Sequence, residues 1–174
     1  PQDQTAPQNA YGRSKLTGEK GIADSGGTYA ILRTSWVVSA HGTNFIKTML
    51  RLSETHDVLN IVCDQIGGPT PARDIAVACL QIAVQLVQEP SKSGIYHFSG
   101  TPDVSWADFA REIFEQAGKP VTVTPIPTTD YPTPAQRPLN SRMDCTATKR
   151  VFGIERPVWI TGLKTILDNL EART

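Results

Sequence analysis

The sequence has no surplus of charge of either sign. Its 174 residues include 17 Lys plus Arg and 17 Asp plus Glu, so the formal net charge at neutral pH is zero. A protein that binds nucleic acid without sequence preference needs excess cations to displace counterions from the phosphates. We therefore expect no nucleic-acid partner.

Long apolar runs and a regular set of cysteines are also lacking. No stretch reaches the ~18 apolar residues that a membrane-spanning helix requires, and no basic segment followed by an apolar one opens the chain. The cysteines are odd in number and scattered, which favours free thiols in a reducing compartment. Neither they nor the histidines have the spacing of metal ligands. We expect a cytoplasmic protein with no membrane partner and no metal; the residues concerned are Cys63, Cys79, Cys145, His41, His56 and His97.

The sequence does contain an alternation of helical and strand-like patterns. Apolar residues recur at helical spacing in several segments, with short β-branched or aromatic runs between them. This order is typical of an α/β fold. Expected helices span 7–25, 45–54, 72–88, 105–117 and 159–170, with a short one from 146 to Gly153, and expected strands span 29–38, 58–63, 94–98 and 121–125.

Capping signals indicate where several helices begin. Thr5 and Gln8 have the spacing of a capping box for the first helix. Asn44 is placed to cap the second helix, and Thr70 to cap the helix at 72–88. Ser105 and Asp108 form a second capping-box pattern at the start of the helix at 105–117.

The composition of two further segments predicts burial for one and irregular structure for the other. The helix at 72–88 is apolar nearly all round, which predicts burial between layers. The segment 125–138 holds five prolines, which excludes regular structure there.

The sharpest chemical feature is Tyr11-Gly-Arg-Ser-Lys15. Residues four apart on a helix lie one above the other, so the phenol and the ammonium face the same space. A neighbouring cation stabilises a phenolate, which proton exchange near neutral pH requires. A surface pair with no role is the alternative, and the spacing alone does not distinguish the two.

The surrounding motifs are more specific. They follow one another as Tyr-Gly-Arg-Ser-Lys-Leu-Thr-Gly-Glu-Lys at 11–20, Leu-Arg-Thr-Ser-Trp-Val at 32–37, Asn-Phe-Ile-Lys-Thr-Met-Leu at 44–50, Asp-Gln-Ile-Gly-Gly-Pro-Thr at 64–70 and Tyr-Pro-Thr-Pro-Ala-Gln-Arg-Pro-Leu-Asn-Ser at 131–141. This series resembles the extended short-chain dehydrogenase/reductases. Within them it is similar to the branch that reduces the keto group of a dTDP-linked 6-deoxy sugar. The resemblance covers nearly the whole chain.

The resemblance implies the C-terminal portion of a Rossmann-like parallel sheet plus a smaller α/β substrate-binding region. Residues 1–43 would be a remnant of the cofactor-binding domain. Residues 44–174 would be mainly the substrate-binding region, with some helices returning to pack on the Rossmann part. The family's glycine-rich turn, which cradles the cofactor pyrophosphate, has no counterpart in the sequence. We therefore expect a C-terminal piece of a longer reductase, inactive by itself.

The implied activity is the NADPH- or NADH-dependent reduction of the C4 keto group of dTDP-4-dehydro-6-deoxy-L-mannose. The product, dTDP-L-rhamnose, supplies cell-surface polysaccharide. Tyr11 would be the catalytic acid that protonates the sugar oxygen. Lys15 would stabilise the phenolate and hydrogen-bond the nicotinamide ribose, so both residues would also contact the cofactor.

The resemblance also assigns residues to a dTDP-sugar substrate. Trp36 would pack against the sugar nucleotide, the alternative being a core residue at a strand end. Arg137 is a candidate clamp for the diphosphate, because a guanidinium matches phosphate oxygens, and a solvated loop arginine is the alternative. Asn44 would donate to the nucleotide, although an N-cap explains it equally well, and Gln65 is a weaker candidate of the same kind.

Other functions stay open at this point. A sugar-nucleotide epimerase or dehydratase would share the fold, although the Arg-Thr-Ser-Trp strand favours the reductase. A non-catalytic regulatory subunit with a reductase-like fold could also keep Tyr11 and Lys15. The sequence does not choose between NADH and NADPH, and it leaves a homodimer open.

Overall fold

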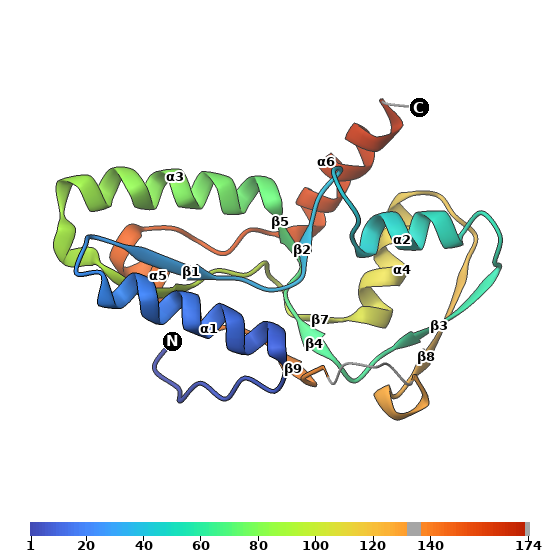
Figure 1. Ribbon diagram of the computed structural model, residues 1–174. Coiled ribbons are helices and arrows are strands. Elements are labelled where there is room, and N and C mark those ends of the chain that lie inside the picture. The colour runs from blue at the N-terminus through green and yellow to red at the C-terminus, as the bar shows by residue number, and fades with distance from the viewer. Residues whose placement is uncertain (132–136, 173–174) are drawn as a thin grey trace.

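The computed structural model describes residues 1–131 and 137–172 and shows an α/β protein, as expected (Figure 1). The helices are α1 (Ala10–Asp24), α2 (Phe45–Leu52), α3 (Ala72–Gln88), α4 (Trp106–Gln116), α5 (Thr146–Phe152) and α6 (Trp159–Glu171), with 3-10 turns η1 (Pro90–Lys92) and η2 (Thr128–Asp130). The strands are β1 (Ala30–Arg33), β2 (Val37–Val38), β3 (Val58–Val62), β4 (Ile66–Gly67), β5 (Thr70–Pro71), β6 (Gly94–His97), β7 (Val104–Ser105), β8 (Thr122–Ile126) and β9 (Asn140–Ser141).

The described strands form small sheets that are almost entirely parallel. β1 pairs with β6, β2 with β5, and β3 with β8, each in parallel. In the fourth sheet, β4 lies between β9, which is parallel to it, and β7, which is antiparallel. Figure 1 shows α3 and β1 in one half of the molecule and α2, α4, β3 and β8 in the other, with the short strands between them. The expected parallel pairing is confirmed.

Each half has its own hydrophobic core. In the first, α3 and α5 pack on β6, and the core contains Ala78, Ile82, Leu86, Tyr96, Phe98, Phe152 and Ile154. In the second, α2, α4 and α6 pack together with β3 and β8, and buried residues include Ile46, Met49, Phe109, Ile113, Trp159 and Leu163. Burial of this apolar surface is the main stabilising term of both halves.

Local signals placed several helix ends correctly. Asn44 caps α2, and Ser105 caps α4 by accepting the N–H of Asp108 while its hydroxyl donates to the Asp108 carboxylate. Gly153 ends α5 in the left-handed conformation that a side chain disfavours.

Two predicted caps are wrong. α1 begins at Ala10, where Asn9 accepts the N–H of Gly12 at 2.8 Å, so the Thr5 capping box is not used. Thr70 does not cap α3, because its hydroxyl donates to the carbonyl oxygens of Ser35 and Gly68 instead.

Three further predictions differ from the structure. α3 is not buried between layers: its Val77, Leu80, Val84 and Val87 side chains are exposed. The strand expected at 29–38 is two strands, β1 and β2. The segment 125–138 does contain regular structure, because β8 runs to Ile126 and η2 spans 128–130; Pro125 is tolerated in β8, which pairs on one edge only.

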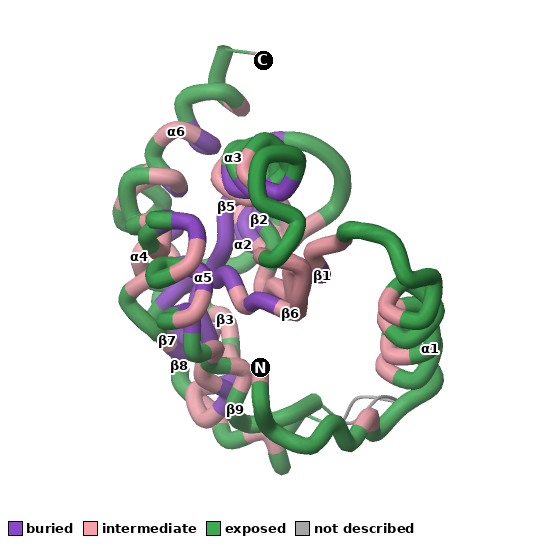
Figure 2. Tube along the Cα trace, turned by 90° about the vertical axis from the view of Figure 1, so that its left-hand side faces the viewer, coloured by how far each residue is buried: buried purple, intermediate pink, exposed green. Residues whose placement is uncertain are grey.

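α1 is the most exposed helix. None of its residues is buried in the part of the chain that the structure describes, and Figure 2 shows it apart from the purple, buried segments. An ion pair ties it to the sheet: the Arg33 guanidinium of β1 donates to both carboxylate oxygens of Glu19, at 2.9 and 2.5 Å. This pairing supports a structural role for Arg33.

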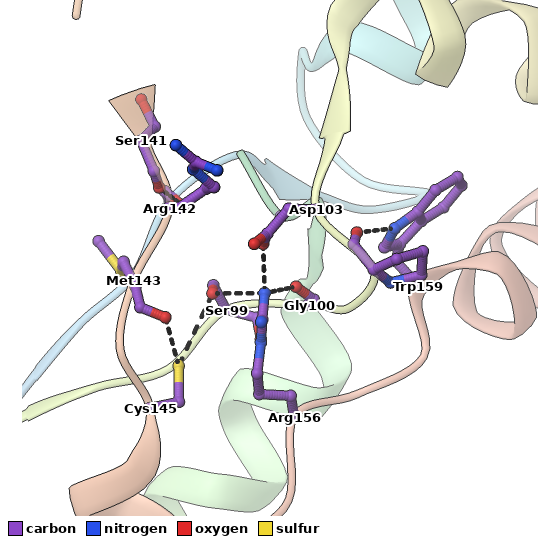
Figure 3. A network of polar contacts seen from close by, with 12 residues as sticks. Ser99, Gly100, Asp103, Ser141, Arg142, Met143, Cys145, Arg156 and Trp159 are labelled. Atoms are coloured by element: carbon purple, nitrogen blue, oxygen red, sulfur yellow. Dashed lines mark hydrogen bonds and ion pairs between the residues drawn. The ribbon is translucent and has the colours of Figure 1, made fainter. Parts of the chain in front are cut away.

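Arg156 fastens the connection between β6 and β7 to the connection between α5 and α6 (Figure 3). Its guanidinium donates to the carbonyl oxygens of Ser99 and Gly100 and to Ser99 Oγ, and it pairs with the Asp103 carboxylate at 2.5 Å. The Trp159 indole N–H donates to the Pro102 carbonyl oxygen at 2.7 Å. These contacts fix where α6 begins.

Candidate active site and substrate cavity

Tyr11 and Lys15 lie next to each other in the first half of α1. The Lys15 ammonium is 5.4 Å from the centre of the Tyr11 ring, so the cation and the phenol share one face of the helix. The Tyr11 side chain is 72% exposed. Lys15 also lines a shallow hollow of about 260 Å³ with Glu19 and Arg33. The phenol and the ammonium are thus neighbours on α1, and their catalytic roles stay predictions.

Trp36 interrupts the strand that was expected to run through it. Its φ is 50°, a left-handed conformation that costs a non-glycine residue about 1–3 kcal/mol. Backbone contacts hold it there: the Trp36 carbonyl accepts the N–H of Thr70 at 3.0 Å, and the neighbouring Ser35 carbonyl accepts the Thr70 hydroxyl at 2.8 Å. The chain thus turns at Trp36, between the end of β1 and the start of β2.

The Trp36 ring is packed against two distant parts of the chain. It stacks on Trp106, with ring centres 3.5 Å apart and planes 8° from parallel. A Cβ atom added at Gly67 would lie 2.7 Å from the Trp36 ring, so any larger residue at that position would displace the indole. Trp36 is therefore half-buried at the junction of β2, β4 and α4 rather than part of either core.

A cavity of about 550 Å³ lies beside this stack. Its polar lining residues include Gln65 and Arg137, two of the candidate substrate-binding residues, which lie far apart in the sequence. An aromatic or apolar wall with a few polar groups is typical of a site for a small organic ligand. The wall comprises Phe45, Met49, Leu52, Leu59, Ile61, Val62 and Trp106, and the polar lining also includes Thr48, Asn60 and Tyr131.

A hydrogen-bonded group fixes one side of the cavity. The Gln65 amide donates to Thr128 Oγ1 at 3.1 Å, and that hydroxyl donates to the Asp64 carboxylate at 2.6 Å. The Thr128 backbone N–H also donates to Asp64, at 3.0 Å. The Thr128 side chain, followed by its backbone, lowers the pKa of Asp64.

This lowered pKa predicts a pH dependence. The stability that Asp64 contributes is present above the ordinary carboxyl pKa of about 4 and is lost as the pH falls through its lower folded-state pKa. Asp64→Asn should therefore destabilise the chain at neutral pH, with the difference shrinking below about pH 4. Denaturant unfolding across this range measures it, and Thr128→Val, which keeps the backbone donor to Asp64, should give a smaller pH-dependent loss of the same sign. A difference that does not change with pH would contradict the prediction.

Asn44 makes the capping contacts rather than facing the cavity residues. Its amide oxygen accepts the Lys47 N–H at 3.5 Å, and its amide nitrogen donates to the Ser39 carbonyl at 2.7 Å. The N-cap interpretation is thus confirmed, and a role in nucleotide binding stays a prediction.

Buried polar atoms at the carboxyl end of the β1–β6 sheet are unsatisfied. Thr34 Oγ1 and His97 Nδ1 have no hydrogen-bond partner among the described residues. Ligands of open parallel sheets bind at this end of the strands, and buried polar atoms normally find partners. Burial also lowers the pKa of His97, which favours its neutral imidazole.

Sequence reasoning missed Trp106 and Thr128. Helical spacing counts Trp106 with the apolar face of the helix expected at 105–117, and it does pack against the second core, but it also lines the cavity. The nearest signal for Thr128 was its place in the proline-rich segment. Part of that segment, 132–136, lies outside the described residues.

Within the two described ranges, no three His, Cys, Asp or Glu side chains gather as a metal site would require. No described helix is both long and apolar enough to cross a membrane.

Comparisons with known proteins agree with this description. The family model for the RmlD substrate binding domain matches residues 1–172. A dTDP-4-dehydrorhamnose reductase of Sinorhizobium fredii is 48% identical over 164 residues, which cover 91% of this chain and 55% of that protein. The chain spans little more than half the length of the curated relatives it matches.

Solved structures give the same result. A dTDP-4-dehydrorhamnose reductase from Clostridium acetobutylicum superimposes with a TM-score of 0.88 at 37% identity, covering 98% of this chain and 59% of that one. One from Bacillus anthracis, in complex with NADP, gives 0.84 at 35% identity and covers 97% and 58%. The expected Rossmann-like fold and the similarity to reductases of dTDP-linked sugars are confirmed, and the chain belongs to the RmlD substrate-binding-domain family.

Proposed function

We propose that the chain is the substrate-binding part of an NADPH- or NADH-dependent reductase that forms dTDP-L-rhamnose from dTDP-4-dehydro-6-deoxy-L-mannose. The observation that carries this proposal is the cavity that joins Gln65 and Arg137 beside the Trp36–Trp106 stack. The reductases named among its relatives favour reduction over epimerisation.

The residues present suit a dTDP-sugar. The apolar wall around Phe45 and Met49 accommodates a flat base, and the Gln65 amide, held by Thr128, supplies a hydrogen-bonding group with a fixed position. Arg137 lies on the same cavity and supplies the positive charge for the diphosphate. Trp36 packs against the sugar in this proposal.

The chain's own part in the chemistry is proton transfer. Tyr11 gives its proton to the C4 oxygen as that oxygen gains negative charge, and Lys15 stabilises the phenolate left behind. A bound nicotinamide supplies the hydride. Lys15 holds its ribose, and the unsatisfied Thr34 and His97 atoms offer further polar contacts at the carboxyl end of the sheet.

The remaining parts of the cofactor site are assigned outside these residues. We place the pyrophosphate cradle in the portion of the relatives that this chain does not span. Residues 1–43 then belong to the cofactor-binding side and residues 44–174 mainly to the substrate side. An additional segment on that side would cover α1, none of whose described residues is buried.

Calorimetric titration of the chain with dTDP-L-rhamnose and with NADPH tests the proposal. We expect the sugar nucleotide to bind and NADPH to bind weakly, because the cavity lies within this chain and the cradle does not. Absence of sugar-nucleotide binding by a folded chain would overturn the assignment of the cavity.

Arg137→Ala tests the diphosphate contact. A charge-assisted hydrogen bond contributes about 1.5–3 kcal/mol, so we expect dTDP-L-rhamnose affinity to fall roughly 10- to 100-fold. In the complete enzyme, NADPH affinity should be unchanged. Arg150→Ala, an exposed arginine on α5, is the matched control. Equal losses for both ligands would indicate a folding defect instead.

A further inference from the structure

The Trp36 indole has its conformation imposed by contacts from elsewhere in the chain. A left-handed non-glycine residue persists only where its surroundings determine it. One of these contacts is the stack on Trp106, which is nearly face to face with ring centres 3.5 Å apart. Gly67 supplies the space on which this packing depends.

Trp106 connects this indole to the cavity. It lines the cavity together with Gln65 and Arg137, while one of its faces is occupied by Trp36. Phe45 packs against it with ring centres 4.5 Å apart, and Phe109 lies 6.3 Å away. Ser105 caps the helix immediately before it, which fixes its backbone. Trp106 is thus held from three sides.

We propose that Trp106 is a positioning residue that holds Trp36 in the orientation in which it meets the sugar of a bound sugar nucleotide. The inference rests on the proposed function. By positioning Trp36, Trp106 increases the affinity for the sugar half of the ligand. This effect is separate from any contact that Trp106 itself makes with the nucleotide half. The Trp36–Trp106 stack connects the proposed sugar-binding and nucleotide-binding parts of the site.

The measured quantity is the ratio of dTDP-L-rhamnose affinity to dTDP affinity. Trp36→Leu removes the sugar contact and should lower this ratio roughly tenfold, the effect of losing one aromatic contact. Trp106→Leu should lower the ratio by the same factor, and the double variant should lower it no further, since both changes remove one interaction. Trp106→Phe, which keeps a ring, should restore part of the ratio.

Two further measurements separate positioning from general damage. Paired indoles give an exciton couplet in far-ultraviolet circular dichroism, which should vanish in either leucine variant and persist in Trp159→Phe. Gly67→Ala should weaken the couplet and the ratio without changing either tryptophan, because its Cβ would meet the Trp36 ring. Gly18→Ala is the control, since a Cβ there meets nothing within 4 Å.

The outcomes distinguish the two proposals. A ratio that is unchanged in Trp106→Leu, or losses that add fully in the double variant, would overturn the positioning role while the proposed function stands. If the unchanged chain is folded and binds neither ligand, the proposed function fails and the positioning role fails with it.

Discussion

Replacing Tyr11 by Phe in the complete enzyme should lower turnover by about two to four orders of magnitude. The change removes only the hydroxyl, and general acid catalysis by a side chain typically contributes a factor of this size. The Tyr11 ring keeps its place beside Lys15, so NADPH affinity should be largely unchanged. Steady-state rates at saturating dTDP-sugar, together with a cofactor titration, measure both quantities.

The controls for this experiment come from the same chain. Tyr29→Phe removes a hydroxyl from a half-buried tyrosine outside α1 and should leave turnover unchanged. Lys15→Met should lower both turnover and cofactor affinity, because Lys15 is proposed to touch the ribose as well as the phenol. Unchanged turnover in Tyr11→Phe would remove Tyr11 from the mechanism.

The largest expected effect on stability is that of Phe109→Ala. Phe109 is fully buried; its ring packs edge to face on Trp159 at 5.1 Å and stacks on Phe45 at 5.6 Å. Truncating a buried Phe removes its transfer free energy and leaves a cavity, which typically costs 3–5 kcal/mol, so we expect a loss of about this size in the free energy of unfolding. Denaturant unfolding monitored by tryptophan fluorescence measures it.

Leu80→Ala provides the matched control, because Leu80 is 70% exposed on α3. Substitutions at such positions usually change stability by less than about 0.5 kcal/mol. If Phe109→Ala cost no more than Leu80→Ala, the assignment of α4 to the core of the second half would be wrong.

Features determined within a few residues were predictable from the sequence. Two helix caps depend on hydrogen bonds to residues three positions away, those of Ser105 on α4 and Asn44 on α2. The end of α5 depends on the left-handed backbone conformation of Gly153. Such signals consist of residue types at short spacings, so they can be recognised in the sequence without knowledge of the fold.

Features imposed from a distance were not predictable. The break at Trp36 is held by backbone contacts with Thr70, and the indole packs on Gly67 and Trp106; all three are separated from it by many residues. The apolar composition of α3 predicted burial on all sides, but composition does not tell what covers each face, and Leu80 is exposed. Long-range packing overrides local propensity in both cases.

Only part of the candidate site could be predicted from the sequence. Tyr11 and Lys15 followed from helical spacing, and Gln65 and Arg137 followed from the family resemblance before the structure showed them on one cavity. Trp106 escaped notice because periodicity counts every apolar residue on a stripe as core. Its position beside a cavity depends on β3 and α2, which the stripe does not encode.

The Arg156 contacts have a consequence for the order in which the protein acquires its structure. During synthesis the carbonyl groups of Ser99 and Gly100 leave the ribosome more than fifty residues before the guanidinium that they will bind. The side chains of Trp159 and Leu163, which complete the second core, emerge later still. Earlier segments can form helices and pair strands on the nascent chain, but the two halves reach their final packing only after α6 has been translated.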